Sequence, residues 1–301
     1  MGRERDGEPD TSTAEAISVV AHEIRLGVLR ALWDAENHAL RFSELRRAVG
    51  VRDTGKFNYH LSKLEGQFLA HVDDRYELLY PGHRVIDAVQ SGVFEEEVAD
   101  RSVPLSETCP DCDAQLAFTY EEFLARIRCR ECSQTVLGYP FDPGGFAGRE
   151  GEAVARAFDT RTRRYWLSAT AGVCPVCAGP TDAGLVADAT TLQALERYEK
   201  HYASDQPALV SVDCDHCSFY SYVPTGVLAL GHPEVVGRLH DHGVDSRDRP
   251  LWSFDCLVDA DCVDLATTDP REVAVTVTAG DGPDGRVTVD ETATVTGVEW
   301  G

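Results

Sequence analysis

Four Cys-x-x-Cys pairs constrain this chain more than any other feature of its sequence. They are Cys109/Cys112, Cys129/Cys132, Cys174/Cys177 and Cys214/Cys217. No apolar run reaches the roughly 18 residues that span a bilayer, and the first ten residues are too polar for a signal peptide, so we expect a cytoplasmic protein with no membrane partner. In that reducing compartment, pairs with this spacing indicate metal ligation before they indicate disulfides.

The first two pairs have the spacing of a four-thiolate zinc ribbon, with sixteen residues between Cys112 and Cys129. In that interval Leu116, Phe118 and Tyr120 alternate before a Glu-Glu turn, a pattern that predicts a hairpin. A hairpin would bring the two pairs around one tetrahedral Zn²⁺. We expect this ion to be structural, because four thiolates leave no open position for a substrate. A disulfide or free thiols are the alternatives.

The last two pairs predict a second zinc site on weaker grounds. Thirty-six residues separate Cys177 from Cys214, more than the usual range, and a helical insert near TLQALERYEKHYA would account for the excess. The sequence leaves open whether pairs are exchanged between the two sites, and it predicts one or two Zn²⁺ per chain. Cys256 and Cys262 have no histidine at ligand spacing and are interpreted as buried or free thiols, and His216 as a surface residue.

The first hundred residues contain no cysteine and show a different pattern. Apolar residues recur at helical spacing over Ala14–Trp33, Ser43 can cap a short helix that stops at Gly50, and Asp53 can cap a third helix. A short hairpin follows, and then another helix after Pro81-Gly82. This order of elements predicts a winged helix-turn-helix.

The distribution of charge sets one part of this region apart. The chain has a net charge of −23, and 25 of its 28 basic residues are arginine, a composition that resembles the proteins of salt-in halophiles. Two of the three lysines, Lys56 and Lys63, nevertheless lie within eight residues of each other, and residues 41–63 have a balance of +4. An ordinary solvated helix face is the alternative explanation.

A helical projection of residues 54–65 places Phe57, Leu61 and Leu64 on one buried stripe. The opposite face offers cations, an amide, a hydroxyl and a phenol, the groups that contact phosphates and base edges in a DNA groove. With the neighbouring arginines, the predicted contacts to double-stranded DNA are Arg46, Arg47, Thr54, Gly55, Lys56, Asn58, Tyr59, Ser62 and Lys63.

The stretches AISVVAHEIRLGVLRAL, FSELRRAVGV and GKFNYHLSKLEGQFL resemble the winged-helix transcription regulators of the ArsR type, in their haloarchaeal variant. The resemblance covers residues 13–92. It implies a dimeric DNA-binding domain with residues 54–65 as recognition helix and Asp73–Arg75 as the tip of the wing, so that Arg75 joins the predicted contacts. The remaining chain resembles the cysteine-rich C-terminal extension of such proteins. Metal-sensing members carry cysteines within the winged helix, and this domain has none.

Enzyme motifs are incomplete or absent. The stretch HEIRL at residues 22–26 lacks the second histidine of a zincin, and CPDC and CPVC reverse the order that nucleotide deaminases need. The sequence shows no P-loop, no nucleophile elbow and no GxGxxG between a predicted strand and a predicted helix. His232, His240 and His242 are interpreted as edge residues of a helix, and we expect no enzyme.

The sequence therefore predicts a multidomain α+β protein: an N-terminal winged helix-turn-helix, then zinc-ribbon-like modules with helical inserts, then a C-terminal β-hairpin. We expect a homodimeric transcription regulator whose C-terminal half binds a small-molecule effector or the transcription machinery. A zinc-ribbon adaptor for RNA or transcription machinery, or a thiol-based redox sensor, is the alternative. The predicted segments are 1–12 (disordered tail), 13–92 (winged helix), 93–108 (acidic linker), 109–148 (first ribbon) and 149–301 (second ribbon-like α/β domain with the hairpin).

Overall fold

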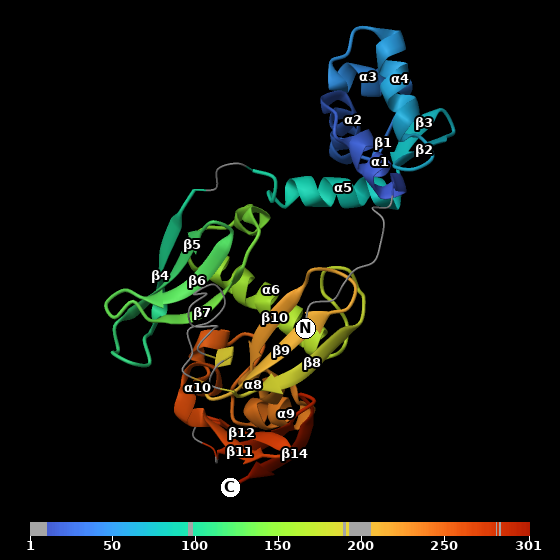
Figure 1. Cartoon of the computed structure of the whole chain (residues 1–301). Coiled ribbons are helices and arrows are strands. Elements are labelled where there is room, and N and C mark those ends of the chain that lie inside the picture. The colour runs from blue at the N-terminus through green and yellow to red at the C-terminus, as the bar shows by residue number, and fades with distance from the viewer. Residues whose placement is uncertain (1–10, 96–98, 189–190, 193–205, 281, 283) are drawn as a thin grey trace. The chain divides into compact units, whose positions relative to one another are not determined.

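In the computed structural model the chain divides into two compact units, residues 1–96 and 97–301 (Figure 1). The predicted disordered tail lies outside the described residues as far as residue 10, and so does most of the predicted helical insert. Within the described part, every helix is too short or too polar to cross a membrane. The structure describes residues 11–95, 99–188, 191–192, 206–280, 282 and 284–301.

The first unit consists of helices and one small antiparallel sheet with strand order β1-β3-β2. Its core contains Val28, Leu29 and Leu32 of α2, which pack with buried residues of the other helices. The elements are α1 (Thr11–Val20), α2 (Glu23–Asp34), β1 (Ala39–Leu40), α3 (Phe42–Val49), α4 (Thr54–Leu64), β2 (Leu69–Val72), β3 (Arg75–Leu78) and α5 (Tyr80–Gln90).

The helical pattern over residues 14–33 belongs to two helices and not to one. His22 has an extended backbone, and its Nδ1 accepts a hydrogen bond from the backbone N–H of Ile24 at 3.1 Å, so it caps the start of α2. The His22 ring also lies against the His60 ring, with 4.1 Å between centroids. A side-chain cap and a tertiary contact thus interrupt a periodicity that continues across the break.

The predicted caps are confirmed at two of three positions. Asp53 Oδ1 accepts from the backbone N–H of Lys56 at 2.8 Å, and Gly50 has a φ of 77° where α3 ends. Ser43 does not cap α3, which already begins at Phe42. Glu44 instead accepts a hydrogen bond from the backbone N–H of Arg41 at 2.9 Å, so an acidic side chain one turn later performs the capping.

Pro81-Gly82 does not precede the last helix of the first unit but lies in its first turn. Proline is tolerated there because the first N–H groups of a helix have no partner within it. Gly82 is buried, and a Cβ at this position would collide with the carbonyl oxygen of Phe68. The glycine therefore allows α5 to pass close to the backbone beside the hairpin.

The second unit contains three antiparallel sheets, with strand orders β4-β5-β6-β7, β10-β9-β8 and β11-β12-β13-β14. In Figure 1 the long helix α6 lies beside the first two of them. Its elements are β4 (Arg101–Thr108), β5 (Gln115–Glu121), β6 (Leu124–Cys129), β7 (Thr135–Pro140), η1 (Pro143–Phe146), α6 (Glu152–Thr170), β8 (Thr181–Val186), β9 (Leu209–Cys214), β10 (Tyr220–Pro224), α8 (Thr225–Gly231), α9 (Pro233–Asp241), η2 (Leu251–Ser253), α10 (Asp255–Val258), η3 (Ala260–Cys262), β11 (Val263–Thr268), β12 (Arg271–Val277), β13 (Gly285–Asp290) and β14 (Val295–Trp300).

One hydrophobic core runs through this unit, so the predicted division into segments 109–148 and 149–301 is not a division between separate cores. The buried helix residue Phe158 contacts Phe118 of β5, with ring centroids 5.8 Å apart. Trp166 contacts Tyr139 of β7, and its indole N–H donates to Ser221 Oγ of β10 at 3.1 Å. Helix α6 thus joins the first sheet to the second.

Two further expectations are corrected at the edges of the unit. Residues 101–108, predicted as the end of an acidic linker, form β4, which pairs with β5 through Val103 and Phe118. The predicted C-terminal hairpin is part of a four-stranded sheet, to which residues 263–268 contribute β11. Both strands are themselves weakly patterned, with mostly exposed residues, so local periodicity does not reveal them although each pairs with the next strand in sequence.

Candidate metal centres and a candidate nucleic-acid interface

The first four cysteines converge on one point, as predicted. The register of the β5–β6 hairpin sets Leu116 opposite Cys129, which brings the pair after β4 to the pair that begins at the last residue of β6. Ligand atoms of Cys109, Cys112, Cys129 and Cys132 lie within 4.8 Å of one another. This tetracysteine group could hold a metal ion.

The distances in this group suit a metal better than a disulfide. The Sγ atoms of Cys109 and Cys132 are 3.7 Å apart, and those of Cys112 and Cys129 are 3.4 Å apart. A disulfide needs about 2.05 Å. Four thiolates at about 2.3 Å from a tetrahedral ion lie about 3.8 Å from each other, close to the observed spacing.

The second group forms despite its long interval. Strands β8 and β9 pair with Thr181 opposite Cys214, and this ladder closes the loop between the two cysteine pairs. The Sγ distances are 3.6 Å from Cys174 to Cys217 and 3.5 Å from Cys177 to Cys214. All four ligand atoms lie within 4.8 Å, so the cysteine pairs are not exchanged between the groups.

All four Cys-x-x-Cys turns share one backbone pattern. The N–H of the first cysteine donates to the carbonyl oxygen five residues later, at 2.8 to 3.0 Å. In three of the turns the residue after the second cysteine has a positive φ, which reverses the chain. The repeated geometry indicates that the second group is built like the first. The donor and acceptor pairs are Cys109/Ala114, Cys129/Gln134, Cys174/Gly179 and Cys214/Phe219.

Backbone N–H groups also point at sulfur in these turns. Burial raises the pKa of Cys129, but the N–H groups of Cys132 and Glu131 donate to its Sγ at 3.4 Å and bring the pKa down to about 6. In the second group, burial is likewise outweighed at Cys214, where the N–H groups of Cys217 and His216 help to bring the pKa to about 6. The thiolate is the form that binds a metal ion.

Gly179 is a further residue of the second site, and none of the sequence motifs singles it out. A Cβ at this position would lie 2.9 Å from Cβ of His216 and 3.2 Å from Sγ of Cys177, so a side chain would crowd the second group. The signal was available, because a glycine directly after a Cys-x-x-Cys-Ala turn marks a close approach. His216 itself is exposed and lies outside the group of ligands, as expected.

The other two cysteines and the histidines of the α9 region lie apart from both groups. Cys256 is buried and Cys262 is half-buried, and burial raises the pKa of both thiols, to about 11 for Cys262. Both are free thiols, as predicted. Within the described part of the chain, the groups that could hold a metal ion include neither these thiols nor the histidines at 232, 240 and 242.

Helix α4 presents the face that the projection predicted. Its buried residues are Phe57, Leu61 and Leu64, together with His60. Tyr59 is 58% exposed, and Nζ of Lys63 lies 5.7 Å from the centre of its ring. The remaining predicted contacts on this helix are also exposed: Thr54, Gly55, Lys56, Asn58 and Ser62.

Three arginines are among the predicted DNA contacts, and two of them donate hydrogen bonds to backbone carbonyl oxygens of the protein. Arg47 is exposed, whereas Arg46 is half-buried and donates to the carbonyl oxygen of Arg52 at 2.7 Å. Arg75 donates to the carbonyl oxygen of Ala39 at 3.2 Å, so it fastens β1 to the hairpin. The predicted wing tip is a turn in which Asp73 and Asp74 both have positive φ. Arg46 and Arg75 therefore stabilise the first unit itself, whether or not they also contact DNA as predicted.

Comparisons with known proteins identify the family. A family model described as a domain of unknown function, DUF7347, matches residues 13–89 of the first unit. Comparison with curated proteins and with solved structures gave no significant match. A second model, also described as a domain of unknown function, DUF7351, matches residues 106–295, which include both tetracysteine groups and more than half of the chain. The chain therefore belongs to the DUF7351 family.

Proposed function

We propose that this protein is a cytoplasmic, sequence-specific DNA-binding transcription regulator. Residues 13–92 act as a winged helix-turn-helix of the ArsR type, with α4 as recognition helix and the β2–β3 hairpin as wing. The order of helices, the three-stranded sheet and the short hairpin support this assignment. The protein binds as a homodimer to two half-sites.

The exposed face of α4 is the observation that carries the proposal. Lys56 and Lys63 lie on the solvent side of a helix whose other side is buried in the core, in a chain with a net charge of −23. Asn58 and Tyr59 offer hydrogen bonds between these cations. Lysine contacts supply affinity for phosphates, and the amide and phenol read base edges.

We also propose that both tetracysteine groups hold structural Zn²⁺. Tetrahedral thiolate ligation suits zinc, and four cysteines fill its coordination sphere, so the ions stabilise the second unit. The second unit then serves the regulator by binding an effector or a protein of the transcription machinery.

The test is selection of a duplex sequence by the full-length protein, followed by binding measurements across a series of salt concentrations. A Lys56→Ala/Lys63→Ala variant should bind the selected duplex more weakly, and its plot of log K against log salt should be flatter by about two units. Arg30→Ala/Arg84→Ala removes the same charge from other exposed positions of the first unit and should retain the slope. Equal slopes for parent and lysine variant would refute the role of α4.

A further inference from the structure

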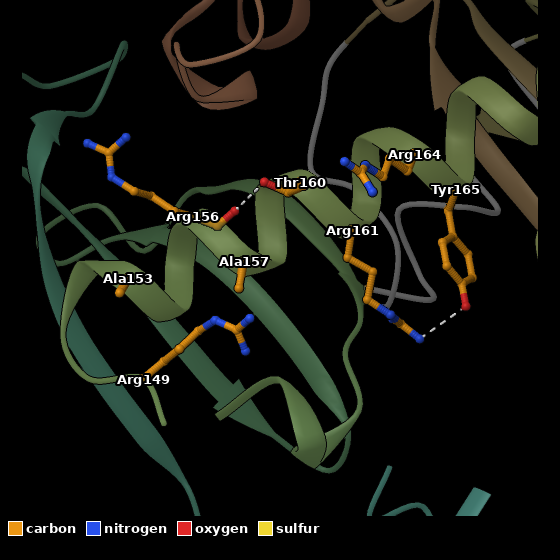
Figure 2. A pocket seen from close by; sticks show the side chains of 8 residues that line it. All are labelled: Arg149, Ala153, Arg156, Ala157, Thr160, Arg161, Arg164 and Tyr165. Atoms are coloured by element: carbon orange, nitrogen blue, oxygen red, sulfur yellow. Dashed lines mark hydrogen bonds between the residues drawn. The ribbon is translucent and has the colours of Figure 1, made fainter. Parts of the chain in front are cut away.

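Helix α6 carries a shallow groove that the proposed function does not use (Figure 2). The groove measures about 480 Å³. Two neighbouring rows of side chains, each spaced four residues apart, form it along one face of the helix and the segment just before it. One row contains Arg156, Thr160 and Arg164, and the other runs from Arg149 through Ala153, Ala157 and Arg161 to Tyr165.

Two of the four arginines in the groove are held by the protein. Arg161 pairs with Asp142 at 2.6 Å and donates to the hydroxyl of Tyr165 at 3.3 Å. Arg149 donates to the carbonyl oxygen of Gly145 at 3.2 Å. These contacts orient two guanidinium groups at the edge of an apolar floor made of alanines.

The other two arginines are available to a ligand. Arg156 and Arg164 are exposed, and neither has an ion-pair partner in the described part of the chain. Another arginine of α6, Arg163, does not line the groove and pairs with the buried Asp159. Exposed arginines without carboxylate partners are unexpected in residues 97–301, where 34 acidic residues face 16 basic ones.

The shape of the groove favours an extended anion over a small one. The groove residues on α6, from Ala153 to Tyr165, span about 18 Å at 1.5 Å per residue. Arg149 extends the groove to the segment just before the helix. A site for a small molecule buries most of its ligand, which a shallow groove does not do. Guanidinium groups spaced along a line match a chain of phosphates, to which each can donate two hydrogen bonds.

We propose that the α6 groove binds the phosphodiester backbone of duplex DNA, with Arg156 and Arg164 as the phosphate contacts. The inference rests on the proposed function for the choice of ligand: once α4 is bound, the covalent link gives the second unit a high effective concentration of the same DNA. The groove contacts no base edges, so it adds affinity without sequence preference. It also offsets the repulsion between DNA and an acidic unit.

The test uses the full-length, metal-loaded protein with Arg156→Gln and Arg164→Gln together. Binding to the selected duplex and to a duplex of scrambled sequence should weaken by the same factor, about tenfold or more at low salt, and the salt slope should flatten by about two units. The matched control is Arg247→Gln/Arg286→Gln, which removes the same charge from exposed positions of this unit outside the groove.

Each outcome separates this inference from the proposed function. If the α6 variant binds both duplexes like the parent while Lys56→Ala/Lys63→Ala does not, the regulator stands and the groove is overturned. If only the α6 variant loses affinity, the groove stands and α4 is not the recognition helix. Equal losses of duplex affinity in the α6 variant and the arginine control would overturn the α6 proposal. So would an α6 variant that binds both duplexes like the parent but binds single-stranded RNA more weakly.

Discussion

Asp159 on α6 accepts a hydrogen bond from the backbone N–H of Leu251 at 2.7 Å, across 92 residues of sequence. The same carboxylate pairs with Arg163 at 3.3 Å. Arg163 in turn donates to the carbonyl oxygens of Ser246 at 2.6 Å and Arg249 at 2.9 Å. One buried ion pair thus fastens the loop over residues 246–251 to the central helix of the second unit.

Replacing Arg163 with methionine should destabilise the second unit by about 3–5 kcal/mol, because it leaves the buried carboxylate of Asp159 without its partner. The double variant Asp159→Asn/Arg163→Met should recover part of this loss, since it removes the unpaired charge. Urea unfolding of the metal-loaded protein measures both. A double variant less stable than the single one would contradict this explanation.

The loss in Arg163→Met should also depend on pH. Burial raises the pKa of Asp159 above its ordinary value, and Arg163 acts against this rise. Without Arg163 the pKa rises further, so the folded variant holds its proton more tightly than the unfolded chain. Its stability then falls relative to the parent as pH rises through that pKa. The difference between parent and variant should be larger at pH 8 than at pH 5, and a constant difference would count against this account.

Elemental analysis of the reduced, freshly purified protein should find about two zinc ions per chain. Cys129→Ser and Cys174→Ser should each lower the count by one, because each removes a ligand from a different group. Cys262→Ser is the matched control and should leave the count at two, since this thiol lies outside both groups. Loss of both ions in either single variant would mean that the two sites are not independent.

Two glycines of the first unit should respond in opposite ways to alanine. Gly82→Ala should cost several kcal/mol, because the added Cβ collides with the backbone of Phe68. Gly55→Ala should leave the fold intact or stabilise it by up to about 1 kcal/mol, because its Cβ meets only Asp53 Oδ1 at 3.4 Å and alanine favours a helix. Thermal unfolding measures both. If the backbone of Gly55 approaches a phosphate, this variant should bind DNA more weakly although it remains folded.

The first unit should lose stability in acid through His60. Burial lowers the pKa of this histidine, and the positive charges of His22, Arg25 and Lys56 lower it further. The folded state therefore binds the proton less readily than the unfolded chain, so stability is lost as pH falls below the unfolded pKa of about 6.5. Melting temperatures at pH 7.5 and 5.5 should differ less for His60→Leu than for the parent. The control, exposed His71→Gln, should behave like the parent.

Several local features could be predicted from the sequence because short-range chemistry decides them. The spacing of the first four cysteines predicts their convergence, since a hairpin brings such pairs together. The cap at Asp53 and the αL residue Gly50 depend only on neighbouring groups. The faces of α4 follow from helical periodicity, because burial of Phe57, Leu61 and Leu64 needs only one apolar partner surface.

Other features depended on contacts between distant segments, which no local pattern encodes. The break between α1 and α2 involves the contact of His22 with His60, 38 positions later in the sequence. Helix α6 joins the first sheet to the second through Phe158 and Phe118, 40 positions apart in the sequence. Strand β4 pairs with the next strand, but most of its residues are exposed, so its own sequence predicts a linker.

The sequence by itself determined the two tetracysteine groups, the amphipathic helices and the concentration of lysine on α4, because spacing and periodicity carry that information. Only the tertiary structure decided that the two cysteine-rich segments share one core, that Gly82 and Gly179 permit close approaches, and that the arginines of α6 line an open groove. The physical reason is that these outcomes depend on which surfaces pack together across the whole unit, and packing is set by all the contacting residues at once.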